Sequence, residues 1–128
     1  MIILDTSVWI EFLRKNIKYF DLISQMLTKM DILAVEVVFG ELLQGVKNKR
    51  EEEIILDYWK HLPKIDNDTE IIISAGIYSH KNKLIDQGVG LIDSIIIMHG
   101  IKTDSKIWTL DTNFFKAIPS ELIYTANI

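Results

Sequence analysis

The chain opens with an apolar run from Met1 to Leu4, and this run ends in a carboxylate, Asp5. A short apolar stretch without polar alternation is typical of a strand that is buried on both faces. Because a buried charge without a partner is costly, Asp5 is expected just past the carboxyl end of that strand. Ligands bind at this edge in open α/β sheets. The run therefore predicts an α/β domain with Asp5 beside a candidate site.

The rest of the chain alternates helical patterns with short apolar runs. Strands that are separated by helices predict parallel pairing with right-handed crossovers. The length of 128 residues fits one domain, 1–128, in which helices predominate over a small central parallel sheet of about four to five strands. Helices are expected from a Thr6 or Ser7 cap to Leu13, over 18–29, 37–46 and 49–62, from Asp68 or Thr69 to about Gln87, and over 91–101; further strands are expected at 31–35, 107–110 and 122–124.

Composition excludes several classes of protein. Hydrophobic residues make up 48% of the chain, which argues against a disordered protein, and the absence of cysteine excludes disulfides and thiolate sites. No apolar run approaches the roughly 18 residues of a membrane span, and no basic segment precedes the opening run, so a cytoplasmic protein is expected. The net charge of −4 argues against a general nucleic-acid coat. It allows a nuclease whose acids gather at one site.

Two acids lie within apolar helical patterns. Glu41 shares a semi-buried helix face with Val37 and Gly45. Asp93 lies in the segment 91–98, which is apolar nearly all round and therefore predicts a buried helix. A carboxylate there must be paired, protonated or bound to a metal. The structural alternatives are an exposed glutamate on an amphipathic helix, and a first-turn aspartate that the helix dipole stabilises.

A fourth acid, Asp111, follows the strand expected at 107–110, as Asp5 follows the first strand. Two parallel strands that end in this way would place both carboxylates on the same sheet edge. The alternative is that Asp111 caps a helix at 112–115. A ring of four carboxylates would repel itself and raise its pKa values unless a divalent cation were present. All-oxygen ligands suit Mg²⁺ or Mn²⁺, and the matching chemistry is phosphodiester hydrolysis by metal-activated water.

The chain resembles a PIN-domain nuclease, and more narrowly a VapC-like toxin of a toxin–antitoxin pair. The resemblance lies in the segments 4–10 (LDTSVWI), 40–45 (GELLQG), 91–94 (LIDS) and 109–114 (TLDTNF), which together cover essentially the whole chain. It implies a three-layer α/β/α domain and a type II toxin that acts as an Mg²⁺- or Mn²⁺-dependent endoribonuclease, leaving 5′-phosphate and 3′-hydroxyl ends. The implied partners are RNA, a small antitoxin that inserts into the groove, and a second copy of the chain.

Carried onto this sequence, the resemblance assigns roles to individual residues. The four catalytic acids would be Asp5, Glu41, Asp93 and Asp111, with Asp5, Asp93 and Asp111 as metal ligands. Thr6 would support the site through its hydroxyl, and Asn113 occupies a position that is often polar near the metal, so either Asp111 or Asn113 contacts the ion. The third-acid helix begins with 89–92 (VGLI) rather than with the proline-aspartate that is usual there. Positive charge for RNA is expected from Arg14, Lys47, Lys49 and Arg50.

Two other functions fit parts of the sequence. A PIN-like module that binds a protein or RNA without cutting it would place basic partner residues against the acids, and the intact set of four argues against it. A phosphoacceptor or phosphatase domain with Asp5 as nucleophile would need a second acid two residues later, where Ser7 stands. Trp9 and Trp108 lie in apolar elements and are expected in the core or in an interface rather than against bases.

Overall fold

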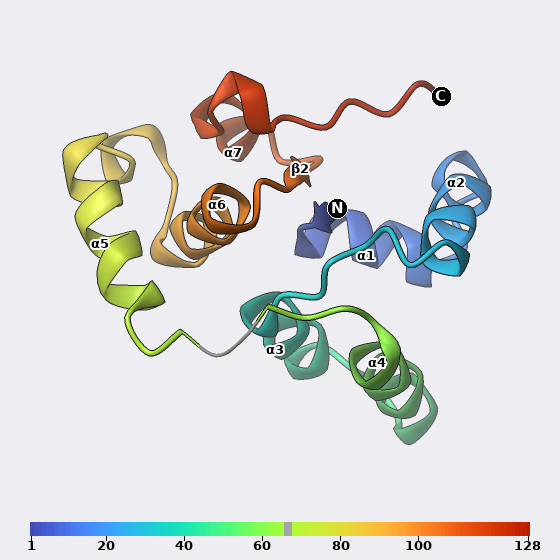
Figure 1. Cartoon of the computed structure of the whole chain (residues 1–128). Coiled ribbons are helices and arrows are strands. Elements are labelled where there is room, and N and C mark those ends of the chain that lie inside the picture. The colour runs from blue at the N-terminus through green and yellow to red at the C-terminus, as the bar shows by residue number, and fades with distance from the viewer. Residues whose placement is uncertain (66–67) are drawn as a thin grey trace.

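The computed structural model describes residues 1–65 and 68–128, and it is a helix-rich α/β fold. In Figure 1 the two strands lie at the centre, with α6 against β2 and α1 beside β1. Within the described residues, no helix is long and apolar enough to cross a membrane. The elements are β1 (Ile2–Leu4), α1 (Thr6–Leu13), α2 (Ile17–Thr28), α3 (Glu36–Gln44), α4 (Lys49–His61), α5 (Ile71–Lys81), the 3₁₀ turn η1 (Ile85–Gln87), α6 (Leu91–Thr103), β2 (Lys106–Trp108), α7 (Thr112–Ala117) and the 3₁₀ turn η2 (Ser120–Leu122).

The two strands pair in parallel, as the alternation of helices and apolar runs predicts. Leu4 of β1 lies opposite Trp108 of β2, and both side chains are almost fully buried. Among the described residues, α1 to α6 all precede β2, so the pairing joins residues about a hundred positions apart. This register determines what stands next to each residue at the carboxyl ends of the strands.

The expectation of four to five strands is wrong, because the described residues form two strands. The segments at 31–35 and 122–124 run beside the sheet, but they contact it through isolated bridges. A ladder needs successive bridges, and the chain leaves the sheet before a second one forms. The single parallel bridges are Ile2↔Ile32, Ala34↔Lys64 and Ile107↔Ile123.

The helix expected from Asp68 or Thr69 to about Gln87 is also shorter than predicted. Helix α5 ends at Lys81, and Lys83 then adopts a left-handed conformation with φ of 53°. The Leu84 amide donates to the Ser79 carbonyl at 3.0 Å, which is the bond that closes a left-handed helix end. The reversal buries Leu84, of which only 2% is exposed. The helix therefore ends in a left-handed turn that places Leu84 in the core.

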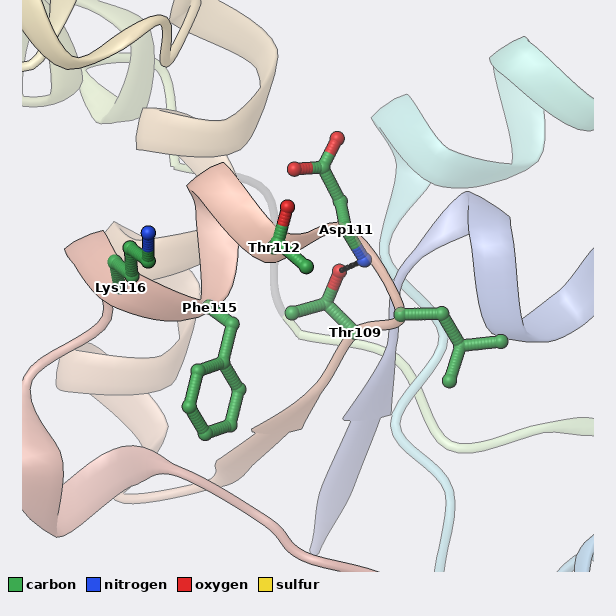
Figure 2. Close-up of a pocket in the computed structure, with 6 residues that line it drawn as sticks. Thr109, Asp111, Thr112, Phe115 and Lys116 are labelled. Atoms are coloured by element: carbon green, nitrogen blue, oxygen red, sulfur yellow. Dashed lines mark hydrogen bonds between the residues drawn. The ribbon is translucent and has the colours of Figure 1, made fainter.

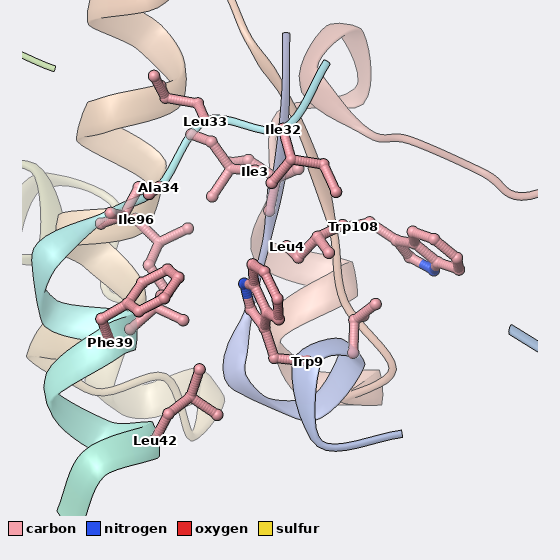
Figure 3. Close-up of a cluster of buried hydrophobic side chains, with 14 of the residues drawn as sticks. Ile3, Leu4, Trp9, Ile32, Leu33, Ala34, Phe39, Leu42, Ile96 and Trp108 are labelled. Atoms are coloured by element: carbon pink, nitrogen blue, oxygen red, sulfur yellow. The ribbon is translucent and has the colours of Figure 1, made fainter. Parts of the chain in front are cut away.

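The core lies between the sheet and the helices that follow each strand. Trp9 of α1 contacts Phe39 of α3, with ring centroids 5.2 Å apart, as Figure 3 shows. Trp9 and Trp108 are both buried, which confirms their expected place in the core. These contacts join α1 to α3, and hence bring Glu41 on α3 to the end of β1 where Asp5 lies.

Close packing of α6 on β2 depends on Gly100. A Cβ atom at this position would stand 2.9 Å from Ile107 Cδ1 and 3.2 Å from the Ser105 carbonyl oxygen. The missing side chain lets the helix approach the strand, and α6 continues past Gly100 to Thr103. Asp93 lies near the other end of the same helix.

We expect Gly100→Ala to destabilise the protein and Gly76→Ala to stabilise it. At Gly100 overpacking costs about 1–3 kcal/mol, which exceeds the gain in helix propensity of about 1 kcal/mol. At Gly76, in α5, nothing lies within 4 Å of an added Cβ, so only the gain applies. Urea denaturation of the two variants and the wild type measures both effects. Equal stabilisation by both substitutions would contradict the close approach at Gly100.

Candidate active site

Asp5 occupies the junction between β1 and α1. Only 6% of the residue is exposed, and its Oδ1 accepts the Val8 amide at 3.3 Å. Asp5 is thus the N-cap of α1, and the expectation that Thr6 or Ser7 caps this helix is wrong. The carboxylate satisfies the first turn because it lies one residue before the helix, where a side-chain oxygen can reach the free amides. The predicted position just past the strand is confirmed.

Two hydroxyl groups hold the Asp5 carboxylate. The Ser7 hydroxyl donates to Oδ1 and the Thr109 hydroxyl donates to Oδ2, each at 2.5 Å. Each hydroxyl oxygen also accepts a backbone amide at 3.0 Å, from Leu110 and from Asp111 respectively. These amides fix the direction of both hydroxyls, so that their protons point at Asp5. The carboxylate therefore ties the end of β1 to the end of β2.

Sequence reasoning missed the roles of Ser7 and Thr109. The only signal for Thr109 is the strand register, since Leu4 opposite Trp108 puts Thr109 next to Asp5. The sequence presents Ser7 as a candidate helix cap and as the place where a second acid is missing, but not as a hydrogen-bond donor to Asp5. Burial raises the pKa of Asp5, while the hydrogen bonds from Ser7 and Thr109 lower it, and burial has the larger effect.

The structure joins Thr6 and Glu41 across 35 residues of sequence. The Thr6 hydroxyl donates to Glu41 Oε1 at 2.6 Å, and Glu41 is half-buried on α3. Thr6 was expected to support the site through its hydroxyl, and the acid that it contacts is Glu41. Since Thr6 follows Asp5 directly, this hydrogen bond fixes the second acid relative to the first.

The pKa of Asp93 depends on the other three acids. It lies half-buried in the first turn of α6, whose N-cap, Gly90, offers no side-chain cap. Burial and, after it, the negative charges of Asp5, Asp111 and Glu41 together raise the pKa of Asp93 to about 6. Asp93 is therefore close enough to each of the other three acids for their charges to disfavour its ionised form.

Asp111 caps helix α7, so the structural alternative for this residue is confirmed. Its Oδ1 accepts the Phe114 amide at 3.0 Å. The strand expected to run to Leu110 ends at Trp108, and Asp111 stands two residues beyond Thr109, which faces Asp5. Asp111 is exposed, and its charge still contributes to the raised pKa of Asp93. Capping and membership of the acid group are compatible.

The remaining predicted residues are dispersed. Asn113 is exposed on α7, and its amide nitrogen would stand 3.2 Å from a Cβ at Gly88, so it packs on the turn before α6. Arg14 pairs with Glu11 at 3.2 Å, and Lys49 lies 4.0 Å from Glu52. Lys47 lies in the α3–α4 connection, and Arg50 lines a groove between α1, α2 and α4. Among these four bases, Arg50 alone lines a described groove.

The donor chemistry of the four acids suits a divalent cation that prefers oxygen. Within residues 1–65 and 68–128, no three acidic or histidine side chains stand at the spacing of ligands to one metal ion. Each of three acids is instead stabilised separately: Asp5 by two hydroxyls, Glu41 by Thr6, and Asp111 by the first turn of α7. Burial and the neighbouring negative charges raise the pKa of Asp93, and a bound Mg²⁺ or Mn²⁺ would neutralise those charges.

We expect Asp93→Asn to stabilise the metal-free protein near neutral pH. A carboxyl with a pKa of about 6 in the fold, above its unfolded value, contributes stability that is present below about pH 4 and lost as the pH rises through 6. At pH 7 the variant should gain on the order of 1–2 kcal/mol, because solvent screens part of the repulsion at a half-buried group. The two proteins should differ little at pH 4.

Thermal melting in chelator at several pH values measures this difference. Asp86→Asn, at an exposed aspartate in η1, is the matched control and should leave the melting temperature nearly unchanged at every pH. A lower melting temperature of Asp93→Asn at pH 7 would show instead that the Asp93 charge stabilises α6 through the helix dipole.

Comparison with known proteins identifies the family of the chain. A family model described as the PIN domain matches residues 2–119, a segment that contains all four acids. A comparison with curated proteins gives no match. PIN domains are generally metal-dependent nucleases, so the match supports a hydrolase of the nuclease type. Since the matched segment is nearly the whole chain, this protein belongs to the PIN-domain family.

Proposed function

We propose that this chain is a metal-dependent endoribonuclease and the toxin of a type II toxin–antitoxin pair, acting on RNA in the cytoplasm. The observation that carries the proposal is the coupling of Asp93 to three other acids in a PIN domain. Repelling carboxylates lower stability unless a cation or substrate relieves them, and such groups cluster at functional sites. The resemblance of the four acid segments to VapC-like toxins supports the finer assignment.

The residues divide the work as follows. Asp5, Asp93 and Asp111 would hold the cation, and Ser7 and Thr109 orient Asp5 for this purpose. Glu41 completes the acid group in the orientation that Thr6 gives it. A bound divalent cation supplies a water of lowered pKa and neutralises charge on the phosphodiester. Metal-bound carboxylates commonly depend on such hydrogen-bonded partners.

We expect Asp5→Asn to lower RNA cleavage by more than about a hundredfold, since even the partners of ligands matter by 10–100-fold. The measurement is cleavage of total RNA by the purified chain with Mg²⁺ or Mn²⁺, with mapping of the products, which should carry 5′-phosphate and 3′-hydroxyl ends. Asp104→Asn is the matched control, because Asp104 is exposed and has a φ of 51° that asparagine tolerates. Cleavage that persists in chelator, or in Asp5→Asn, would overturn the proposal.

An antitoxin partner is the second part of the proposal. A groove of about 910 Å³ lies between α1, α2 and α4. Its lining is largely apolar, with Phe12, Phe20 and Ile54, and it carries two acids and two bases: Glu53, Asp57, Lys15 and Arg50. An apolar groove with charges of both signs favours an amphipathic segment that lays its apolar face into the groove. The homodimer that the resemblance implies finds support in exposed isoleucines of α5, Ile72, Ile73 and Ile77, and analytical ultracentrifugation tests it.

We expect Ile54→Glu to retain RNA cleavage and to escape the antitoxin. Ile54 is 39% exposed in the groove, so a charge there should be tolerated by the fold and should repel an apolar partner. Expression of the wild type alone should slow growth, and co-expression of a short reading frame just upstream should restore it. The variant should stay toxic when co-expressed, whereas Ile17→Glu, at a 91% exposed residue outside the groove, should be rescued. Rescue of both variants would exclude the groove as the docking site.

A further inference from the structure

A second groove leads away from the candidate active site along the β2–α7 segment. It consists of two adjoining pockets of about 320 and 230 Å³ that share Thr109, Leu110 and Phe115, and we call it the β2–α7 groove. Figure 2 shows the first pocket, with Thr109 and Asp111 from the connection and Phe115 and Lys116 from α7. Lys18, Tyr19, Trp108 and Tyr124 line the second pocket. The groove thus begins at the acid group and continues along aromatic side chains.

Phe115 is the one exposed aromatic side chain among the described residues. It is 43% exposed, whereas its neighbour Phe114 lies in the core and is only 1% exposed. Helix α7 therefore uses one phenylalanine for packing and presents the next one to the groove. A single exposed apolar residue is ordinary on a surface, so the weight comes from what surrounds this ring.

Three further rings form the floor and wall of the second pocket. Trp108 is buried, and its ring centroid lies 6.0 Å from that of Tyr19 and 5.2 Å from that of Tyr124. The two half-buried tyrosines are thus held in place by a rigid tryptophan. The Lys18 amino group lies 5.5 Å from the Tyr19 ring centroid, which adds a positive charge to the aromatic surface.

The groove and the acid group share backbone and side chains. Thr109 lines both pockets and donates its hydroxyl to Asp5, and Trp108 pairs with Leu4 immediately before Asp5. An RNA strand with a phosphate at the acids would therefore place its next nucleotides over Phe115 and then over Tyr19. Lys18 and Lys116 line this path, and Asp111 is the one acidic side chain among the residues that line it.

We propose that the β2–α7 groove binds unpaired nucleotides next to the scissile phosphate of RNA, with Phe115 and Tyr19 stacking on successive bases. This inference rests on the proposed ribonuclease function. Bases expose their faces only in single-stranded RNA, where aromatic side chains and nearby lysines are the usual contacts. Phe115 and Tyr19 are thus positioning residues, and they restrict the substrate to single-stranded segments.

Binding of a fluorescein-labelled 12-nucleotide RNA to the full chain in chelator tests the groove directly. Phe115→Ala and Tyr19→Ala should each raise the Kd about tenfold, as stacking contributions of this kind do. Phe115→Tyr should bind within about twofold of the wild type, and Phe115→Leu, which keeps an apolar side chain without the ring face, should resemble Phe115→Ala. Ile101→Ala on α6, at a side chain that is 43% exposed as Phe115 is, is the control for an exposed apolar side chain and should bind as the wild type does.

The lysine variants and a duplex give independent readouts. Lys18→Gln should raise the Kd for RNA and make it less dependent on salt concentration. Lys29→Gln, at the other end of α2, should change neither quantity. The duplex of the same RNA should bind at least about tenfold more weakly than the single strand. Phe115→Leu and Lys18→Gln retain side-chain bulk, so they remain informative if an alanine variant does not fold.

Cleavage separates this inference from the proposed function. In Phe115→Ala the KM for single-stranded RNA should rise while kcat stays nearly unchanged. The reason is that the variant loses the same binding energy in the substrate complex and in the transition state. If the wild type cuts RNA and the folded Phe115 and Tyr19 variants bind and cut it equally well, the proposed base binding by the groove is wrong. The proposed ribonuclease function then still stands. A wild type that binds through the groove but cuts no RNA would overturn the function alone. No binding of single-stranded RNA by the wild type would overturn the groove.

Discussion

The Asp5 carboxylate, with one hydroxyl on each oxygen, is the interaction on which the rest of this structure depends. It is almost fully buried at the point where β1 becomes α1, and it satisfies the first turn of that helix. Ser7 and Thr109 donate to it, and their own oxygens accept amides from the β2–α7 connection. A buried carboxylate without such donors would be strongly unfavourable. Fold and site therefore share one hydrogen-bond network at the end of the sheet.

This network explains why function and stability oppose each other in the acid group. The pKa of Asp93 rises because burial and three neighbouring charges disfavour its ionised form. The protein keeps these charges together through contacts that are favourable one by one, such as the hydrogen bond from Thr6 to Glu41. Sites of this kind commonly carry a stability cost that a ligand relieves. A divalent cation is the ligand that the donor chemistry favours.

Local patterns were sufficient to predict the features that depend on neighbouring residues. The apolar run before Asp5 predicted a buried strand, and apolar periodicity located α3 and α6 to within about two residues at each end. Two of the four acids follow apolar strands and two lie within apolar helical patterns, and the raised pKa of Asp93 shows that its charge interacts with those of the other three. Local patterns also gave both readings of Asp111, whose capping role is confirmed.

Features that depend on distant residues were missed. Thr109 faces Asp5 only through a strand register that joins residues 104 positions apart, and one threonine gives no sign of this in sequence. The end of α5 is set by a lysine with positive φ and by the burial of Leu84, so neither glycine nor proline marks it. The number of strands was overestimated because the apolar segments beside the sheet are buried, but each makes only isolated bridges.

The central claim is that the four carboxylates form one electrostatic group around Asp5, and carboxyl NMR titration of Asp93 tests it most directly. In metal-free protein the account predicts a pKa of about 6 for Asp93. It also predicts that neutralising Asp5, Glu41 or Asp111, one at a time, lowers this pKa, since each removes a repelling charge. An ordinary aspartate pKa that none of these substitutions changes would contradict the account.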